Sequence, residues 1–242
     1  ARLNGGVNLN YRNNKWNVYG GVNGGTFEGF NRMNIDRRLY GNNGQLLRSI
    51  DQVSRPKYTG DYENFKLGAD YYFSPKDVIG VEMNAGMSTN NETPVSNTNI
   101  RDNQGNIVSR LYTGSKNKRK SDRFTTNINY KHTFDSTGRE ITVDLDYQQY
   151  NMRNRSLMTT ESLNPNGEKI GDDVLLRGDI PSVINVYSGK VDYVHPVSKT
   201  FKIEAGLKSS FVETDNQVRY FRAQGNGWTP DARTNHFVYK EN

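Results

Sequence analysis

The sequence predicts an all-β protein, an antiparallel up-and-down meander of long strands. Apolar and polar residues alternate over long segments, and turn signals recur about every 61 residues. Composition is the third observation. Only 33% of the 242 residues are hydrophobic and the mean hydropathy is −0.88, yet the chain contains 15 tyrosines and 10 phenylalanines. Disordered chains are poor in aromatic residues, so a folded sheet with one polar face explains the composition better.

The alternation is clearest in segment 65–73, where every odd position is apolar. The same period of two recurs in segments 79–87, 124–134, 141–147, 189–193 and 201–211. A period of two over nine or more residues suits a tilted strand that crosses a bilayer. A soluble β-sandwich also alternates, but it usually has shorter strands. The pattern therefore favours a barrel wall.

Two series of turns share one period and are out of phase by half of it. The first series consists of short polar turns at residues 13–15, 74–77, 135–139 and 196–199. The second has glycines at 44, 105, 167 and 227, inside polar segments of about thirty residues such as 28–61 and 89–122. Short turns at one end and long loops at the other are typical of outer-membrane barrels. We therefore predict that residues 1–242 belong to the wall of one transmembrane β-barrel domain.

Aromatic residues gather near the short turns. They are Tyr11, Trp16, Tyr71, Tyr72, Phe73, Tyr130, Phe134, Tyr193 and Phe201. This distribution predicts an aromatic girdle at the periplasmic surface of the membrane. Ordinary cross-strand aromatic pairing is a compatible interpretation.

Several segments carry a family resemblance. They are KLGADYYFSPK (66–76), NYKHTFDSTGRE (129–140), LRGDIP (176–181) and KVDYVHPVSK (190–199). They resemble the outer-membrane β-barrel family common in Bacteroidetes, which is related to TonB-dependent receptors, and the resemblance covers essentially the whole chain. It implies a barrel of about 22 strands behind an N-terminal plug. The chain accounts for about eight or nine strands, with no plug and no TonB box, so we expect a fragment of the barrel. Closure into a small eight-stranded barrel is the alternative.

The resemblance implies a wall segment of an outer-membrane receptor that takes up a nutrient or metal chelate in a Gram-negative cell. The implied partners are outer-membrane lipid and lipopolysaccharide, a plug domain and TonB through the parent protein, and an unidentified small-molecule or glycan cargo. A structural or adhesive surface barrel without transport is the first alternative, and a soluble all-β repeat protein is the second. The net charge of +6 is spread along the chain, which argues against a nucleic-acid partner.

No residues predict catalysis or a cofactor. Asp144, Asp146 and Glu204 project from the polar face of their strands, but no serine and histidine accompany them as a nucleophilic triad requires. We expect them to belong to a lattice of hydrogen bonds and ion pairs in the lumen, and we expect no enzyme activity.

No pattern predicts a metal site either. The chain has no cysteine, which excludes thiolate ligands. His132, His195 and His236 lack an acidic or second histidine partner at ligand spacing, so membrane-interface positions are favoured for them. The segment Asp102–Asn106 faintly resembles a calcium loop but lacks the distal glutamate. We predict a β-turn there.

The densest basic run is the remaining candidate site. It contains Lys116, Lys118, Arg119 and Lys120. On an extracellular loop that returns to the membrane, these side chains would contact lipopolysaccharide phosphates. A solvated loop explains the run equally well, so both interpretations stay open.

Overall fold

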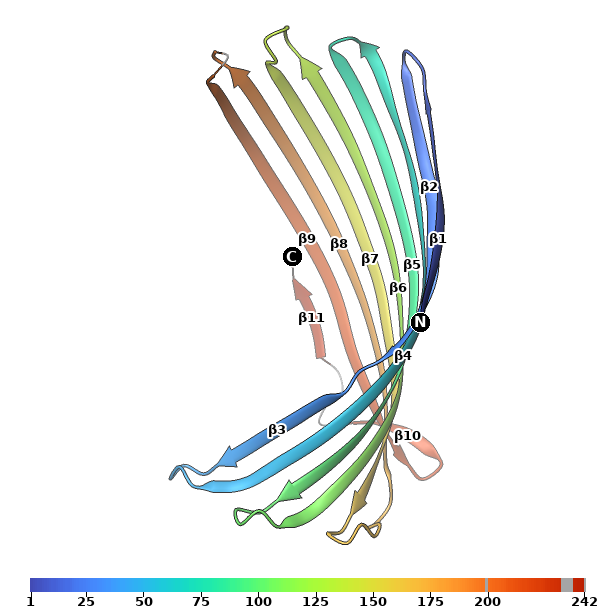
Figure 1. Cartoon of the computed structure of the whole chain (residues 1–242), viewed down its shortest axis with the longest axis vertical. Helices are drawn as coiled ribbons and strands as arrows, with labels where there is room; N and C mark the ends of the chain where they lie inside the picture. Colours follow the sequence, from blue (N-terminus) through green and yellow to red (C-terminus); the bar gives the residue numbers. More distant parts are fainter. Residues whose placement is uncertain (199, 232–236, 242) are drawn as a thin grey trace.

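The computed structural model describes residues 1–198, 200–231 and 237–241, which form one antiparallel sheet of eleven strands (Figure 1). The first strands are β1 (Arg2–Arg12), β2 (Trp16–Phe30), β3 (Met33–Tyr40) and β4 (Leu46–Ser74). The next are β5 (Asp77–Arg101), β6 (Ile107–Thr133), β7 (Glu140–Leu163) and β8 (Val174–Pro196). The last are β9 (Lys202–Gln224), β10 (Gly227–Pro230) and β11 (Phe237–Glu241). The predicted all-β meander is confirmed.

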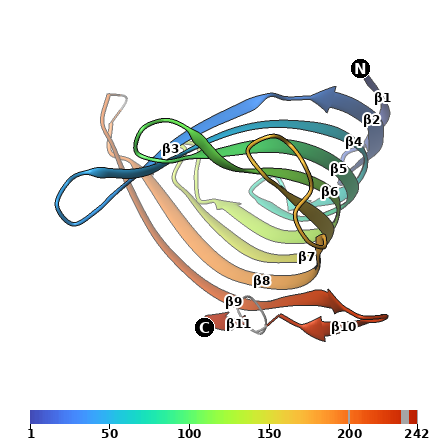
Figure 2. The same cartoon turned by 90° about the horizontal axis from the view of Figure 1, so that it is seen from below.

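The strands follow one another in the sheet in the order β1-β2-β4-β5-β6-β7-β8-β9-β10. Strand β3 continues the direction of β2 alongside β4, and the short β10 and β11 both pair with β9. The remaining eight strands are long, in agreement with the predicted eight or nine. Among the described residues β1 pairs only with β2, so the sheet is an open arc and not a closed barrel (Figure 2).

The turns lie where the sequence predicts them, with one small correction. Each of the first three short turns joins two long strands, and Asn13 supports its own turn because its Oδ1 accepts hydrogen bonds from the backbone of Lys15 and Trp16. Three glycines of the second series have positive φ: Gly44 (75°), Gly105 (91°) and Gly167 (90°). In the fourth turn the positive φ of 57° belongs to Gly225, because Gln224 pairs with Gly227 and so makes Gly227 the first residue of β10. The predicted short turn at 196–199 includes Lys199, which lies outside the described residues.

The long polar segments are β-hairpins, which corrects the prediction of long loops. Residues 89–122 lie almost entirely in β5 and β6, which are 25 and 27 residues long. Because a bilayer crossing takes only about 9–11 residues, these strands extend far beyond the membrane. Figure 1 shows the hairpins bending away together at the end opposite the short turns. Their backbone groups pair with neighbouring strands, so the chain needs no apolar residues to stay extended.

The register gives the sheet one apolar and one polar face. One outward row consists of Trp16, Tyr71, Ile79, Tyr130, Val143, Val191 and Leu207. The neighbouring row on the other face consists of Asn17, Asp70, Gly80, Asn129, Asp144, Lys190 and Lys208. Large side chains on the apolar face are exposed, for example Leu67 at 60% and Leu145 at 54%. An exposed apolar band of this kind needs lipid around it.

The polar face lines the concave side of the arc. None of the described hydrophobic residues is buried, whereas Ser54 and Ser96 are 4% and 8% exposed and share a hydrogen bond of 2.9 Å between their hydroxyl oxygens. Side chains converge on the concave face of a curved sheet and spread apart on its convex face. The more covered, polar face is therefore the lumen face, and the apolar face is the outer one.

Candidate functional site

Two belts of aromatic rings bracket the apolar face. At the short-turn end Tyr71 contacts Trp16 and Phe73, with ring centroids 4.6 and 4.9 Å apart, and Phe134 lies 6.2 Å from Tyr193. This is the inner belt that the sequence predicts, except for Tyr72, which follows Tyr71 in β4 and therefore lies on the concave face. An outer belt consists of Phe124, Tyr147, Tyr187 and Phe211, with successive centroids 6.5, 5.1 and 6.3 Å apart. The outer belt was not predicted, because its members come from four strands and follow no spacing along the chain.

The concave face between these levels carries a lattice of polar contacts, as predicted. Asp146 accepts hydrogen bonds from Asn127 (2.8 Å) and Ser188 (3.1 Å). Glu204 pairs with the Nζ of Lys202 at 2.6 Å, and Asp144 lies opposite Lys190 in the register. Asp146 and Glu204 therefore have structural partners within the wall, whereas Lys190 forms its ion pair with Asp192 and not with Asp144.

His132 and His195 lie at the short-turn end of the wall. The Nδ1 of His132 is 2.6 Å from Asp77 Oδ1, and its ring packs edge-on against Phe134 with centroids 4.6 Å apart. The sequence missed Asp77 as a partner because it lies 55 positions away and reaches His132 only through strand pairing. His195 shares a hydrogen bond of 3.1 Å with the hydroxyl of Tyr193, and His236 lies outside the described residues. Within the described part of the chain no group of three or more histidines and carboxylates is placed to hold a metal ion.

The segment Asp102–Asn106 is a turn, as predicted. The Asp102 Oδ1 accepts hydrogen bonds from the backbone nitrogens of Gln104 (2.9 Å) and Asn106 (2.8 Å). The carboxylate is thus used to hold the chain reversal between β5 and β6.

The basic run is divided between the two faces of β6. Lys118 pairs with Arg155 and lies on the outward face, whereas Arg119 pairs with Asn154 and lies on the concave face. Lys116 and Lys120 are each two positions from Lys118, so they lie on the same outward face. The run is therefore not a single cluster on a loop, and Arg119 is directed away from the lipid.

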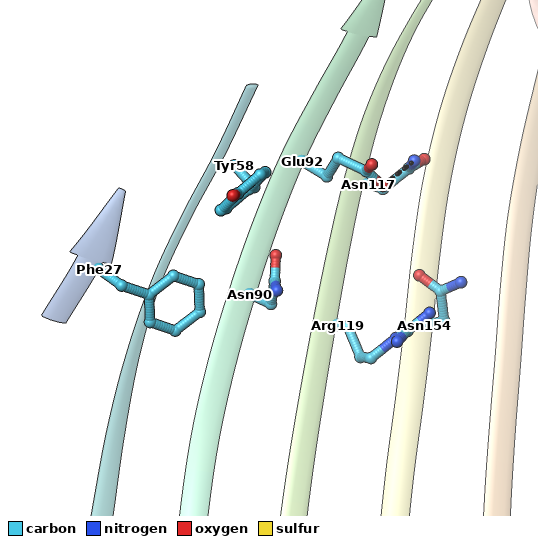
Figure 3. Close-up of a pocket in the computed structure, with 7 residues that line it drawn as sticks. All are labelled: Phe27, Tyr58, Asn90, Glu92, Asn117, Arg119 and Asn154. Carbon is cyan, nitrogen blue, oxygen red and sulfur yellow. Dashed lines mark hydrogen bonds between the residues drawn. The ribbon is translucent and has the colours of Figure 1, made fainter. Parts of the chain in front are cut away.

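A hollow of about 510 Å³ on the concave face is the candidate ligand site (Figure 3). Seven residues from five neighbouring strands line it: Phe27, Tyr58, Asn90, Glu92, Asn117, Arg119 and Asn154. Figure 3 shows Arg119 extending towards Asn154, while the Phe27 ring reaches across the neighbouring strand. Sequence patterns missed this site because most of its members lie in segments 28–61 and 89–122, which were predicted to be loops.

Two glycines make room for the aromatic rings of the hollow. Phe27 pairs with Gly60, and a Cβ atom on Gly60 would lie 2.4 Å from the Phe27 ring. Tyr58 pairs with Gly29 in the same way, with its ring 2.5 Å from the position of a Cβ atom. Each ring therefore covers the glycine opposite it, and their centroids are 6.3 Å apart. The result is a two-ring platform on the wall.

The remaining lining groups are three amides, one carboxylate and one guanidinium. The Asn117 amide nitrogen donates a hydrogen bond of 3.4 Å to Glu92 Oε2, and the Ser115 hydroxyl donates one of 2.9 Å to Asn117 Oδ1. This set offers several donors and acceptors but no nucleophile beside a base. It can therefore bind a neutral or zwitterionic polar solute.

The hollow lies close to the outer surface of the membrane. Phe27 is eleven positions beyond Trp16, which belongs to the inner belt. At a rise of about 3.3 Å per residue and a strand tilt of roughly 40°, this places Phe27 roughly 28 Å above that belt. The site therefore lies at the outer end of the lumen.

The exposed apolar band, the aromatic belts and the polar concave face define the wall of a transmembrane β-barrel. Residues 132–242 match the outer membrane protein beta-barrel family, which places the protein in the outer membrane. The match covers 111 of the 242 residues, whereas the resemblance in the sequence extends over essentially all of them. No curated protein and no solved structure matches the chain. Among the described residues no helix is long and apolar enough to cross a membrane.

Proposed function

We propose that this wall belongs to an outer-membrane transporter of the TonB-dependent type, and that its hollow binds a polar, oligosaccharide-like solute on its way inwards. The observation that carries the proposal is the combination of a two-ring platform with three amide side chains on the concave face. Aromatic rings stack on the apolar faces of sugar rings, while amides bond to hydroxyl groups.

The chemistry of the hollow disfavours the other cargo suggested by the family resemblance. A ferric chelate with a net negative charge would need several cations, but Arg119 is the only cation of the lining and Glu92 offsets it. A polar solute without net charge matches this balance better. The proposed transporter needs no catalytic group or resident cofactor in the wall. Energy for uptake would come through the plug and TonB of the parent protein.

Uptake by cells that carry the whole parent protein tests the proposal. Radiolabelled maltoheptaose, a short peptide and a ferric hydroxamate would be compared in wild-type cells, a deletion strain, and a strain with Phe27→Ala and Tyr58→Ala. We expect the deletion to abolish uptake of the oligosaccharide probe and the double variant to reduce it several-fold. A double variant with Tyr11→Ala and Tyr40→Ala, two exposed rings outside the hollow, is the matched control.

An adhesive barrel predicts a different result. In that case the deletion reduces attachment of cells to host or matrix surfaces and leaves the uptake of all three probes unchanged. The absence of a plug-encoding region in the parent gene would also count strongly against transport.

A further inference from the structure

A basic patch lies on the outward face of β6 to β9, beyond the outer aromatic belt. Six cations line it: Lys116, Lys118, Arg153, Arg155, Arg177 and Arg219. One carboxylate, Asp179, lies among them. The register brings them into adjoining rows, for example Lys118, Arg155, Asp179 and Arg219 across four strands. Six positive charges against one negative charge give this side of the wall a marked excess of positive charge.

The patch lies above the apolar band, on the side away from the short turns. Arg153 is twelve positions beyond Ile141, and Arg177 is sixteen positions from Tyr193 of the inner belt. With a rise of about 3.3 Å per residue and a tilt of roughly 40°, the patch spans roughly 30 to 40 Å above the short-turn end. Tyr147 of the outer belt is only six positions beyond Ile141, which is roughly 15 Å by the same measure, so the patch lies roughly 15 Å beyond the outer edge of the apolar band.

Only part of the positive charge is neutralised within the wall. Arg153 holds Asp179 through two hydrogen bonds of 2.7 Å, and Arg155 lies 3.6 Å from the same carboxylate. The Arg153 hydrogen bond keeps the pKa of Asp179 below its usual value, so Asp179 stays ionised. Among the described residues Lys116, Lys118, Arg177 and Arg219 form no ion pair.

The patch also offers apolar surface beside its cations. The Arg177 guanidinium carbon lies 5.0 Å from the centre of the Phe221 ring and 4.8 Å from that of Trp228, so Arg177 contacts both rings. Together with Leu157 these rings line an outward hollow of about 620 Å³. The hollow therefore matches an amphiphile better than a small soluble anion.

Just below the patch, the charge on the same outward face is negative. The row below the patch contains Asp122 and Asp215 on the same face, connected through Asn151 and Val183. These carboxylates repel an anion there. The next outward row contains Lys120 and Arg153. The charge therefore changes from negative to positive between these two adjacent rows.

We propose that this patch is a binding site for the phosphate groups of lipopolysaccharide, with the acyl chains against the apolar face below. Charge complementarity, continuity with the lipid-facing band and the position of the patch above that band support this site. The site has other members than the basic run suggests. Lys116 and Lys118 belong to it, arginines from β7, β8 and β9 complete it, and Arg119 is excluded.

Binding of purified lipid A to the whole protein in detergent tests the proposal. The patch variant is Lys118→Gln with Arg219→Gln, which keeps the ion pairs of Asp179 with Arg153 and Arg155. The matched control is Arg55→Gln with Lys57→Gln, which removes two exposed cations from the same face of β4. We expect the patch variant to bind bisphosphorylated lipid A about tenfold more weakly, with the control close to wild type. Dephosphorylated lipid A should bind all three proteins equally.

Competition with inorganic phosphate tests whether the bound phosphate belongs to a lipid. The salt dependence of wild-type binding tests the proposal even if the patch variant fails to fold. Inorganic phosphate at millimolar concentration should not displace lipid A, and effective displacement would show a site for free phosphate instead. Raising the salt concentration from about 0.1 to about 0.5 M should weaken the binding of phosphorylated lipid A to the wild-type protein, and should not weaken the binding of dephosphorylated lipid A. Equal affinities of patch variant and control, or salt-independent wild-type binding, would overturn the proposal.

Discussion

The two faces of β6 and β7 differ sharply at the level of the outer membrane surface. On the concave face Arg119 and Asn154 line a hollow with aromatic rings and amides. On the outward face Lys118 and Arg155 lie in a patch of cations, and the Arg155 side chain is 62% exposed. These pairs are direct neighbours along the chain, and only the pleat of the strand separates them. One basic run therefore contributes to two sites with different partners.

The difference between the faces is tested most severely within the membrane. Leu145 on the outward face should tolerate no charge, and we expect Leu145→Lys to lower the free energy of unfolding by about 2–4 kcal/mol. Thr125→Lys is the control, because Thr125 lines a concave hollow that also contains Glu82 and Asp146. Its cost should stay below about 1 kcal/mol. Urea unfolding in lipid vesicles measures both, and equal losses would refute the assignment of the faces.

The concave site is tested by adding a side chain at Gly60, which the Phe27 ring covers. A Cβ atom on Gly60 would lie 2.4 Å from the Phe27 ring and 2.7 Å from the Thr89 carbonyl oxygen. We expect Gly60→Val to displace the ring, to cost about 1–3 kcal/mol and to reduce uptake of the oligosaccharide probe.

Gly114→Val on β6 is the control, because nothing lies within 4 Å of a Cβ atom there. It should leave uptake unchanged and have little effect on unfolding. If both variants reduce uptake alike, the effect of Gly60→Val does not come from the Phe27 ring.

Lys118 and Arg119 are adjacent in the chain but lie on opposite faces of β6, so their variants separate the two sites. We expect Arg119→Gln to lower uptake of the oligosaccharide probe roughly threefold and to leave lipid A binding unchanged. Lys118→Gln should do the reverse, with a similar loss of lipid A affinity. Each variant is the control for the other in paired uptake and lipid-binding assays. A shared phenotype would mean that the two faces are not independent.

The smallest expected effect lies at the short-turn end. Asp77 has a pKa of about 2, against a usual 3.8, because it accepts hydrogen bonds from Ser74 (2.6 Å), His132 (2.6 Å) and Tyr130 (2.8 Å). A lowered pKa means that the ionised carboxylate stabilises the fold above pH 3.8 and that this contribution disappears as the pH falls towards 2. We expect Asp77→Asn to be less stable than wild type at neutral pH and equal to it near pH 2.

Thermal unfolding across this pH range measures the Asp77 effect. Asp36→Asn is the control, because Asp36 is an exposed residue of β3 whose pairing with Arg38 at 3.7 Å is weak. A difference between Asp77→Asn and wild type that persists unchanged at pH 2 would contradict the role of the carboxylate.

The sequence by itself determined the fold class, the short turns and the inner aromatic belt. Side chains alternate between the faces of any strand, so segment 65–73 reveals both faces without knowledge of its neighbours. The turns are likewise local, because Asn13 and Asp102 bond to backbone groups two to four residues away. Such features depend on a few consecutive residues and are therefore visible in the sequence.

The outer halves of the strands and both sites were decided by the tertiary structure. In segment 89–122 both faces are largely polar, so no hydrophobic period reveals the strands, and only pairing with neighbouring strands keeps the segment extended. Phe27 and Tyr58 meet because the register sets a glycine opposite each ring. Arg177 on β8 comes near Lys118 on β6 only because both strands pair with β7. Register is a property of whole strand pairs, and so the sites that depend on it cannot be derived from the spacing of residues along the chain.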